Sequence, residues 1–341
     1  MNRDKVITLA HGSGGKKMRD LIEGVIGPAF SNPNLNVHED QARLPLNELL
    51  SKGDRLAFTT DSYVITPLFF PGGDIGSLAV HGTVNDLAVS GAIPLYLSCG
   101  LVIEEGFDLI TLGRVLEKMA AAAQNCGVQV VTGDTKVVPR GAADGLFINT
   151  SGIGVLPSHL HPSALALREG DVIISSGTLG DHGAAVVLAR GQLDLSAAVE
   201  SDSQSIVDLV QAVIAQVPVV AMRDPTRGGL AAVLSEWAEA SRVNISICMP
   251  DLPISPSVRS LCEVLGFDAV HLANEGKVIL AVKPEHEALT LEILHAHPKG
   301  KSAAAIGRVR AAPSGLVTMR TGFGTETVLT LPAGEQLPRI C

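Results

Sequence analysis

Five aspartates are placed where strands should end or helices should begin, and carboxylates of this kind can hold a metal ion. They occur in the segments EDQARL, TTDSY, VNDLAVSGA, TGDTK and RDPTRGG as Asp40, Asp61, Asp86, Asp134 and Asp224. Mg²⁺ bound between a protein and a triphosphate typically uses a few carboxylate oxygens. A single aspartate in such a place is more readily a helix cap or a turn residue. Five of them, beside a glycine-rich loop, favour metal–nucleotide binding.

The glycine-rich loop near the amino terminus has the composition of an anion-binding loop. Gly12 to Lys16 reads GSGGK, so several backbone N–H groups can converge where a helix is expected to begin. The segment matches neither the P-loop nor the dinucleotide-binding fingerprint. A phosphate loop and a plain tight turn are both open interpretations here, and the preceding His11 by itself favours a structural role.

Three charged residues in short polar motifs are candidates for direct chemistry. Lys136 in GDTK could neutralise phosphate charge or the charge that develops on a reacting oxygen. Glu275 in ANEGK comes just before an expected strand, and Arg227 in DPTRGG precedes two glycines at an expected helix start, where it could meet a phosphate bidentately. The alternatives are surface charges for Lys136 and Glu275 and a helix-capping turn for the arginine motif.

The last residue of the chain is a cysteine, Cys341. A prenylation motif needs three residues after its cysteine, which excludes that interpretation. The adjacent α-carboxylate should raise the pKa of this thiol by like-charge proximity, and Arg339 can offset the effect. We therefore interpret Cys341 as a carrier thiol on a swinging arm rather than as a self-activated nucleophile.

Expected strands and helices alternate along the chain, which predicts an α/β fold. Two domains are expected from the length of 341 residues, with the proline-containing segment PSHLHPSAL as the linker. We predict an amino-terminal domain over 1–157, a carboxyl-terminal domain over 163–331 and a flexible tail over 332–341. Helical or strand patterns place elements near residues 15–30, 55–65, 74–90, 95–103, 108–126, 129–138, 146–156, 171–176, 183–190, 205–216, 228–242, 258–265 and 277–283, with a terminal hairpin over 316–331.

The composition and net charge of the chain argue against some classes of binding partner. The chain has a formal net charge of −9 and only 8 Phe, 2 Tyr and 1 Trp, which argues against nucleic acid and against an anionic membrane surface. The sequence contains no run of about 18 apolar residues, so no membrane-spanning helix is predicted. The amino-terminal segment lacks the long apolar region of a secretory signal. Five scattered cysteines without a CxxC pair fit a reducing, cytoplasmic setting.

The segments HGSGG, TDSYVITPLFFPGGDIG, VNDLAVSGAIP, TGDTK, DPTRGGLAAV, ANEGK and the terminal PRIC together resemble the HypE family of hydrogenase maturation proteins, within the PurM-like superfamily. The resemblance spans the chain, and the terminal PRIC is its most specific element. It implies two PurM-like domains, of which the amino-terminal domains of two subunits pair into a β-barrel across a homodimer. It also implies ATP and Mg²⁺ as cofactors, HypF as carbamoyltransferase partner, and the HypC–HypD complex as the recipient of cyanide.

Carried over motif by motif, the resemblance also implies roles for individual residues. The catalytic residues would be Cys341, Glu275 and Lys136. Mg²⁺ would be bound by Asp61, Asp86 and Asp224, with Asp134 and Asp40 as further candidates. ATP would be contacted by Gly12, Ser13, Gly14, Gly15, Lys16, Asn85, Thr135 and Arg227.

The implied reaction is ATP-dependent dehydration of an S-carboxamide on Cys341 to an S-cyanate. Two alternatives stay open. One is a small-molecule ATP-dependent synthetase or kinase of the same superfamily, for which Cys341 would be dispensable. The other is a non-enzymatic scaffold whose tail docks a partner and which hydrolyses no ATP.

Overall fold

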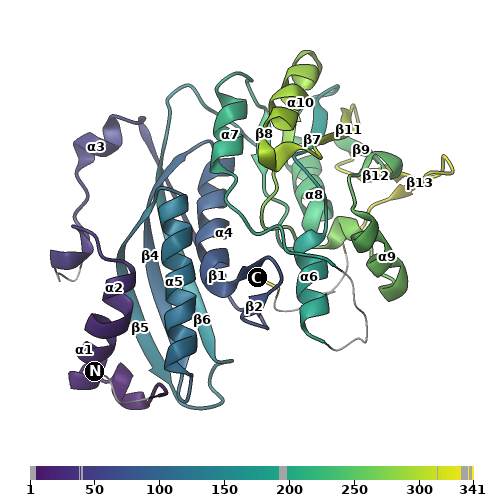
Figure 1. The fold of residues 1–341 in the computed structure, drawn as a ribbon. Coiled ribbons are helices and arrows are strands. Elements are labelled where there is room, and N and C mark those ends of the chain that lie inside the picture. Colours follow the sequence, from purple (N-terminus) through teal and green to yellow (C-terminus); the bar gives the residue numbers. More distant parts are fainter. Residues whose placement is uncertain are drawn as a thin grey trace.

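The computed structural model describes residues 5–37, 39, 41–191, 198–312, 314–331, 337 and 340–341. Figure 1 shows two α/β halves side by side, each built around its own sheet, which confirms the predicted fold class. None of the helices in the described part of the chain is long and apolar enough to cross a membrane.

The first half contains a four-stranded sheet in the order β1-β6-β4-β5, in which only β4 and β5 are parallel neighbours. Helices α4 and α5 lie on one face of this sheet (Figure 1). The strands are β1 (Arg55–Tyr63), β4 (Ile93–Glu104), β5 (Gln129–Val138) and β6 (Leu146–Leu156), with the short pair β2 (Phe69–Phe70) and β3 (Gly73–Asp74). The helical segments are η1 (Leu9–Gly12), α1 (Lys16–Leu21), the π-helical turn η2 (Ile22–Ile26), α2 (Gly27–Ala29), η3 (Leu35–Val37), α3 (Leu46–Leu50), α4 (Ile75–Val89) and α5 (Leu109–Asn125).

Both long helices of this half begin at an aspartate cap. Asp74 accepts hydrogen bonds from the backbone N–H groups of Gly76 and Ser77 at the start of α4. Asp108 accepts one from Thr111 N at 2.7 Å at the start of α5. These carboxylates satisfy backbone donors that the first helical turn leaves without partners.

The other face of the four-stranded sheet is exposed. Along β1 the side chains alternate, so that Tyr63 is fully buried against α4 while Leu56 and Phe58 are 60% and 71% exposed. Alternation of this kind is what a strand produces when only one of its faces is packed.

The second half contains a seven-stranded sheet in the order β13-β12-β9-β11-β7-β10-β8. Its central strands β7 and β10 are buried at every position, because apolar clusters cover both faces. The strands are β7 (Val172–Ser175), β8 (Ala221–Arg223), β9 (Asn244–Cys248), β10 (Ile279–Val282), β11 (Ala304–Arg310), β12 (Val317–Arg320) and β13 (Glu326–Val328). The helices are α6 (Asp181–Ala189), α7 (Val207–Ile214), α8 (Gly229–Ser241), α9 (Pro256–Leu265) and α10 (Glu287–Ala296), with η4 (Met249–Asp251), η5 (Ala269–His271), η6 (Pro284–His286) and η7 (Pro298–Gly300).

The structure confirms the elements predicted from apolar spacing, including the terminal hairpin, in which β12 pairs with β13 antiparallel. The sequence did not reveal four elements of the second half, namely β8, β9, α10 and β11. Of the tail predicted over 332–341, residues 332–336 and 338–339 lie outside the described part of the chain.

Candidate active site

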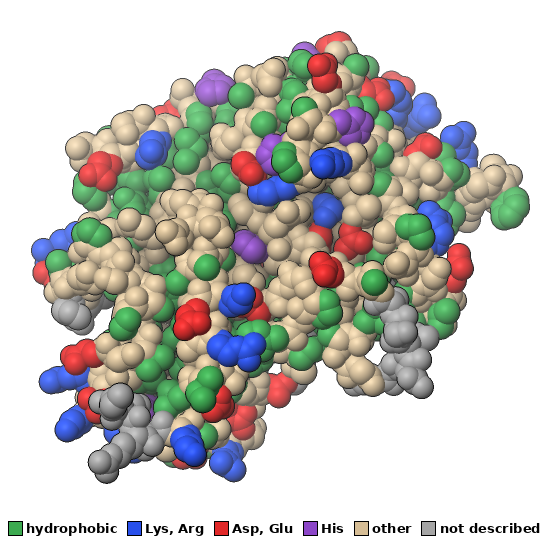
Figure 2. Space-filling model, viewed as in Figure 1, with side chains coloured by type: hydrophobic (Ala, Val, Ile, Leu, Met, Phe, Trp, Pro, Cys, Tyr) green, Lys and Arg blue, Asp and Glu red, His purple; other side chains and the backbone are tan. Residues whose placement is uncertain are grey.

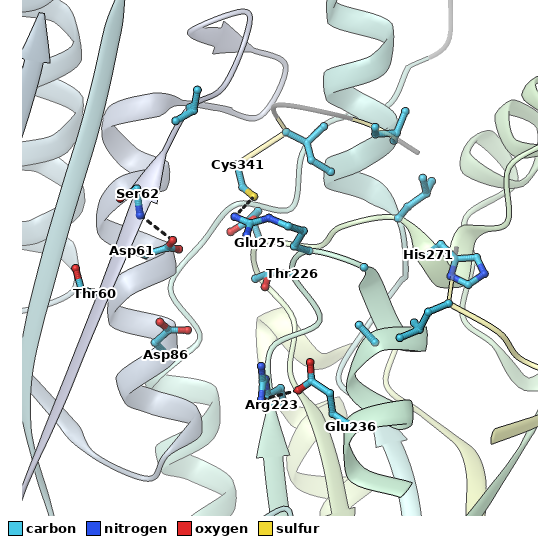
Figure 3. Close-up of a pocket in the computed structure, with 18 residues that line it drawn as sticks. Thr60, Asp61, Ser62, Asp86, Arg223, Thr226, Glu236, His271, Glu275 and Cys341 are labelled. Carbon is cyan, nitrogen blue, oxygen red and sulfur yellow. Dashed lines mark hydrogen bonds and ion pairs between the residues drawn. The ribbon is translucent and has the colours of Figure 1, made fainter. Parts of the chain in front are cut away.

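A cavity of about 750 Å³ lies between the two halves and contains the end of the chain. Figure 3 shows β1 and α4 on one side of it, the segment from β8 into α8 on the other, and Cys341 above Glu275. The lining residues are Thr60, Asp61, Ser62, Val64, Asp86, Arg223, Thr226, Arg227, Gly228, Ala232, Glu236, His271, Leu272, Glu275, Leu331, Leu337, Ile340 and Cys341.

Two of the predicted metal-binding aspartates, Asp61 and Asp86, line this cavity, and Asp224 lines an adjoining one that shares Asp86 with it. Asp61 comes from β1, Asp86 from α4, and Asp224 follows β8 and is only 7% exposed. Burial raises the pKa of Asp224 to about 7, and the nearby carboxylate of Asp86 adds to the shift. Burial also raises the pKa of Asp86, although its Oδ2 accepts a hydrogen bond from Thr59 Oγ1 at 2.8 Å. Asp86 and Asp224 are therefore poorly hydrated, and the nearby Arg223 offsets the rise in their pKa values only in part.

This arrangement fits a divalent cation that is shared with phosphate groups. Among the described residues, no set of three or more His, Cys, Asp or Glu side chains is close enough to hold an ion by itself. Mg²⁺ in nucleotide sites is commonly held by one or two carboxylates, with phosphate oxygens and water completing its shell. The repulsion between Asp86 and Asp224 is the kind that such a cation relieves.

Glu275 is a buried carboxyl group that faces the cavity. It is only 3% exposed, and its Oε1 has no hydrogen-bond partner among the described residues. Burial raises its pKa well above the ordinary value, and the negative charges of Asp224 and Asp202 act in the same direction. An unpaired, poorly solvated carboxyl group is suited to proton transfer.

Cys341 reaches the cavity from the end of the chain. Its Sγ lies 3.5 Å from Arg227 Nη2, and its backbone oxygen accepts a hydrogen bond from Val64 N at 3.2 Å. Burial raises the pKa of the thiol to about 11, Glu275 contributes in the same direction, and Arg227 opposes the shift. In this docked position the thiol is neutral at ordinary pH.

A second group of predicted residues lies elsewhere in the same chain. Lys136 and Asp134 form an ion pair of 2.8 Å on the exposed face of the sheet, and both side chains are more than 60% exposed. Strand register places Asp134 in one row with Gly100, Asn149 and Ser62, so three strand spacings, about 14 Å, separate it from β1. The structure brings Glu275 together with Cys341 but does not bring Lys136 to them within one chain.

The glycine-rich loop also belongs to this second group. Gly15 caps α1, and Lys16 is its first residue. Gly12 packs on β5, where a Cβ would come within 2.9 Å of the Cβ of Val137, so at this position close packing accounts for the glycine. Thr135 of the same strand is buried, while Ser13 and Gly14 are exposed.

Asn85 and Asp40 are the two remaining predicted residues. Asn85 is buried between the halves, where its Nδ2 donates to the carbonyl oxygens of Gln204 and Glu275, and its Oδ1 accepts from Ile206 N. It holds the backbone of Glu275, and a contact with nucleotide stays a prediction. Asp40 lies outside the described residues.

Sequence reasoning missed several residues of the cavity. Arg223 and Glu236 form an ion pair of 2.9 Å that lines it, and His271 lies at its edge (Figure 3). Arg223 adjoins the DPTRGG motif, which is a usable signal, whereas nothing in the surroundings of Glu236 or His271 marks them.

Comparison with known proteins identifies the family. Residues 38–156 match the N-terminal domain of AIR synthase related proteins, and residues 168–320 match the C-terminal domain. The carbamoyl dehydratase HypE of Escherichia coli K12 is 51% identical over 98% of this chain and 99% of its own length. The chain belongs to the HypE family of carbamoyl dehydratases.

Solved structures agree with this assignment. A HypE protein in complex with ATP superposes with a TM-score of 0.92 at 45% identity, covering 98% of this chain and 99% of that one. The HypE of a HypE–HypF complex gives a TM-score of 0.78 at 44% identity, covering 92% and 99%. Both share the two-domain AIR synthase related architecture seen here.

Proposed function

We propose that this chain is an ATP-dependent carbamoyl dehydratase that converts an S-carboxamide on its own Cys341 into an S-cyanate. The observation that carries the proposal is the meeting of the terminal thiol with the buried Glu275 in one cavity that is also lined by Asp61 and Asp86. Family membership supports the same reaction. Because the chain's own end occupies the cavity, the alternative of a free small-molecule substrate is disfavoured.

The chemistry balances with ATP as co-substrate. The amide oxygen attacks the γ-phosphorus, ADP leaves, and one N–H proton is lost as the O-phosphorylated imidate forms. The second N–H proton is then removed while the C–O bond breaks, which leaves the C≡N group and inorganic phosphate. Glu275 is placed to accept these protons, since its Oε1 has no partner among the described residues. Exclusion of water from the cavity during the reaction would limit hydrolysis of the activated intermediate.

The arrangement of carboxylates supports a role for Mg²⁺ with ATP, which is the nucleotide bound by a related HypE protein. Asp86 and Asp224 would hold the ion, with Asp61 close by and Asp40 and Asp134 as further candidates. When bound, the ion neutralises phosphate charge. Arg227 lies beside Cys341 and is suited to contact a phosphate group.

We also propose that the chain works as a homodimer, whose exposed sheet faces pair into a barrel. The open face carries Leu56 and Phe58, which are mostly exposed in one chain, and β1 and β5 are both edge strands. Pairing of two such sheets would cover the apolar side chains and bring Lys136 and the glycine-rich loop toward the other subunit's cavity. This accounts for a site that is divided within one chain.

Loading and unloading of Cys341 require partners. A related HypE forms a complex with HypF, which supports HypF as the carbamoyl donor for this chain. The HypC–HypD complex is the proposed recipient of the cyanide, for the iron of the nickel–iron hydrogenase. All described cysteines are free thiols, in keeping with a reducing, cytoplasmic setting.

The test follows the mass of the tail peptide. The chain is incubated with HypF, carbamoyl phosphate, Mg²⁺ and ATP, and the peptide should first gain a carboxamide and then lose one water. Omission of ATP after the loading step should stop the sequence at the carboxamide. A carboxamide that persists despite ATP and Mg²⁺ would refute the dehydratase assignment and leave a docking scaffold.

A further inference from the structure

The described end of the tail is also bound by a histidine that the proposed reaction does not use. His182, the second residue of α6, is fully buried. Its Nε2 lies 2.5 Å from the carbonyl oxygen of Ile340, and its Nδ1 lies 2.8 Å from Ser201 Oγ. One imidazole therefore joins the residue before Cys341 to the segment around Ser201.

The partners fix the proton positions of this ring. A carbonyl oxygen can only accept, so Nε2 of His182 must carry the proton and donate it to Ile340. Nδ1 is then free to accept from the hydroxyl of Ser201, whose oxygen already accepts from Ser203 N at 3.1 Å. Every group in the chain of contacts is satisfied with a neutral imidazole, and burial of the ring lowers its pKa in agreement.

The side chain of Ile340 adds an apolar anchor. Ile340 is only 7% exposed and belongs to the core cluster that also includes Tyr63, Phe70 and Val186. The Phe70 ring meets the His182 ring edge-on, with centroids 5.5 Å apart. The penultimate residue is thus held by its carbonyl and by its side chain, while Val64 N holds the backbone oxygen of Cys341.

The same segment also holds Glu275. Asp202, next to Ser201, accepts hydrogen bonds from the backbone N–H groups of Glu275 at 3.0 Å and Gly276 at 3.2 Å, and it pairs with Lys277 Nζ at 3.1 Å. The fit is close, because a Cβ on Gly276 would lie 1.9 Å from the carbonyl oxygen of Asp202. Two neighbouring residues of one segment therefore position both reacting groups. Asp202 holds the backbone of Glu275, and Ser201 acts through His182 on the residue before Cys341.

We propose that His182 and Ser201 form a tail clamp, which docks the Ile340 carbonyl and sets Cys341 in register with Glu275. His182 is a positioning residue, since it touches the penultimate peptide group and not the reacting atoms. The ligand of the clamp is a chain end in which an aliphatic residue precedes the cysteine. The catalytic consequence rests on the proposed function, whereas the docking itself is measurable without turnover.

Docking is tested by pulse alkylation of the full-length native chain with iodoacetamide, followed by mass analysis of each cysteine peptide. His182→Ala should raise the alkylation rate of Cys341 roughly fivefold to tenfold, the equivalent of losing one buried hydrogen bond. His182→Gln keeps an amide N–H donor, so its Cys341 alkylation rate should lie between those of the unmutated chain and of His182→Ala. Cys126 and Cys248, which are partly buried, report on the fold and should react as in the unmutated chain.

His81 provides a matched control. It also pairs with a serine of this segment, its Nδ1 lying 3.1 Å from Ser203 Oγ, but it makes no hydrogen bond to the described tail residues. His81→Ala should leave the alkylation rate of Cys341 unchanged. An unaltered Cys341 rate in a folded His182→Ala chain would overturn the clamp, as would an equal increase in His81→Ala.

A second measurement separates positioning from docking. In His182→Ala, HypF should load Cys341 at least as fast as before, while conversion of the carboxamide to the nitrile slows and His182→Gln restores part of it. Faster alkylation with unchanged nitrile formation would overturn the positioning role. If the unmutated chain makes no nitrile, the proposed function fails, but the alkylation comparison still decides whether the clamp exists.

Discussion

Asn85 Nδ2 donates a hydrogen bond of 3.3 Å to the backbone carbonyl of Glu275, and the two residues belong to different halves of the chain. From the opposite side, Asp202 accepts the backbone N–H of Glu275. The peptide groups on either side of the proposed base are therefore held by α4 and by the segment that contains Asp202. The side chain of Glu275 can therefore be replaced while these hydrogen bonds keep its backbone in place.

Glu275→Gln should separate loading from dehydration. Glutamine keeps the size of the side chain and removes its basicity, so carboxamide should accumulate on Cys341 while nitrile formation falls about a hundredfold or more. The mass of the tail peptide over time measures both. Glu263→Gln, on the exposed side of α9, is the matched control and should behave as the unmutated chain. Nitrile formation at the normal rate in Glu275→Gln would assign the base to another group.

Asp86→Asn should abolish ATP turnover without loss of fold. The amide oxygen can still accept the hydrogen bond from Thr59, but the charge needed by Mg²⁺ is gone. Because Asp86 and Asp224 repel each other, the metal-free variant should melt at the same temperature as the unmutated chain or slightly higher. ATPase rate and thermal melting in chelator check the two parts, and carbamoylation by HypF should continue. A normal ATPase rate with a normal melt would remove Asp86 from the metal site.

The fold could be predicted where apolar residues repeat at a clear period. Leu230, Val233, Leu234 and Trp237 mark α8, and all four are buried in the structure. Strand β9 was not predicted, because its sequence NISIC is short and comes only three residues after α8. Its assignment depends on pairing with β11 and β12, contacts that are made only after the chain has folded.

The site could be predicted in part, because its motifs carry unusual residue types. Asp61, Asp86, Glu275 and Cys341 do line one cavity, and Asp224 is buried near Asp86 in the adjoining one. The role of His182 could not be predicted, since its contact with Ile340 joins residues 158 positions apart and the surrounding DHGAA has no distinguishing pattern. Nor could the sequence show that Lys136 lies across the sheet from the cavity, because that separation depends on strand order.

Docking of the tail should weaken at high pH. The docked Cys341 thiol has its pKa raised to about 11, whereas a free thiol titrates near 8.5. Docking therefore favours the neutral thiol, so its contribution is complete below about pH 8.5 and is lost as the pH rises toward 11. Alkylation of Cys341 in the native chain should show an apparent pKa above that of the denatured chain.

Arg227→Gln tests the contribution that opposes this rise in the pKa of Cys341. Arg227 opposes the rise in the pKa of Cys341, so its removal should move the apparent pKa of alkylation further up. A native profile that coincides with the denatured one would show that the thiol spends its time outside the cavity.

Mixing two inactive variants should show whether Lys136 acts on the other subunit's cavity. Within one chain, Lys136 lies on β5, and β1, which lines the cavity, is at the opposite edge of the sheet. We expect Lys136→Ala and Cys341→Ala to be inactive alone. In a mixed dimer, the chain that retains Cys341 would receive Lys136 from its partner, so one of the two sites should be complete.

Random exchange of subunits makes half of the dimers mixed, so about a quarter of the normal number of sites should recover activity. The readout is nitrile formation after the two chains are unfolded together and refolded, or exchanged at low concentration. A second mixture, of Glu275→Gln with Cys341→Ala, serves as the control, because Glu275 and Cys341 line the same cavity of one chain and should not complement. Recovery in the control mixture, or none in the Lys136 mixture, would contradict a site shared between subunits.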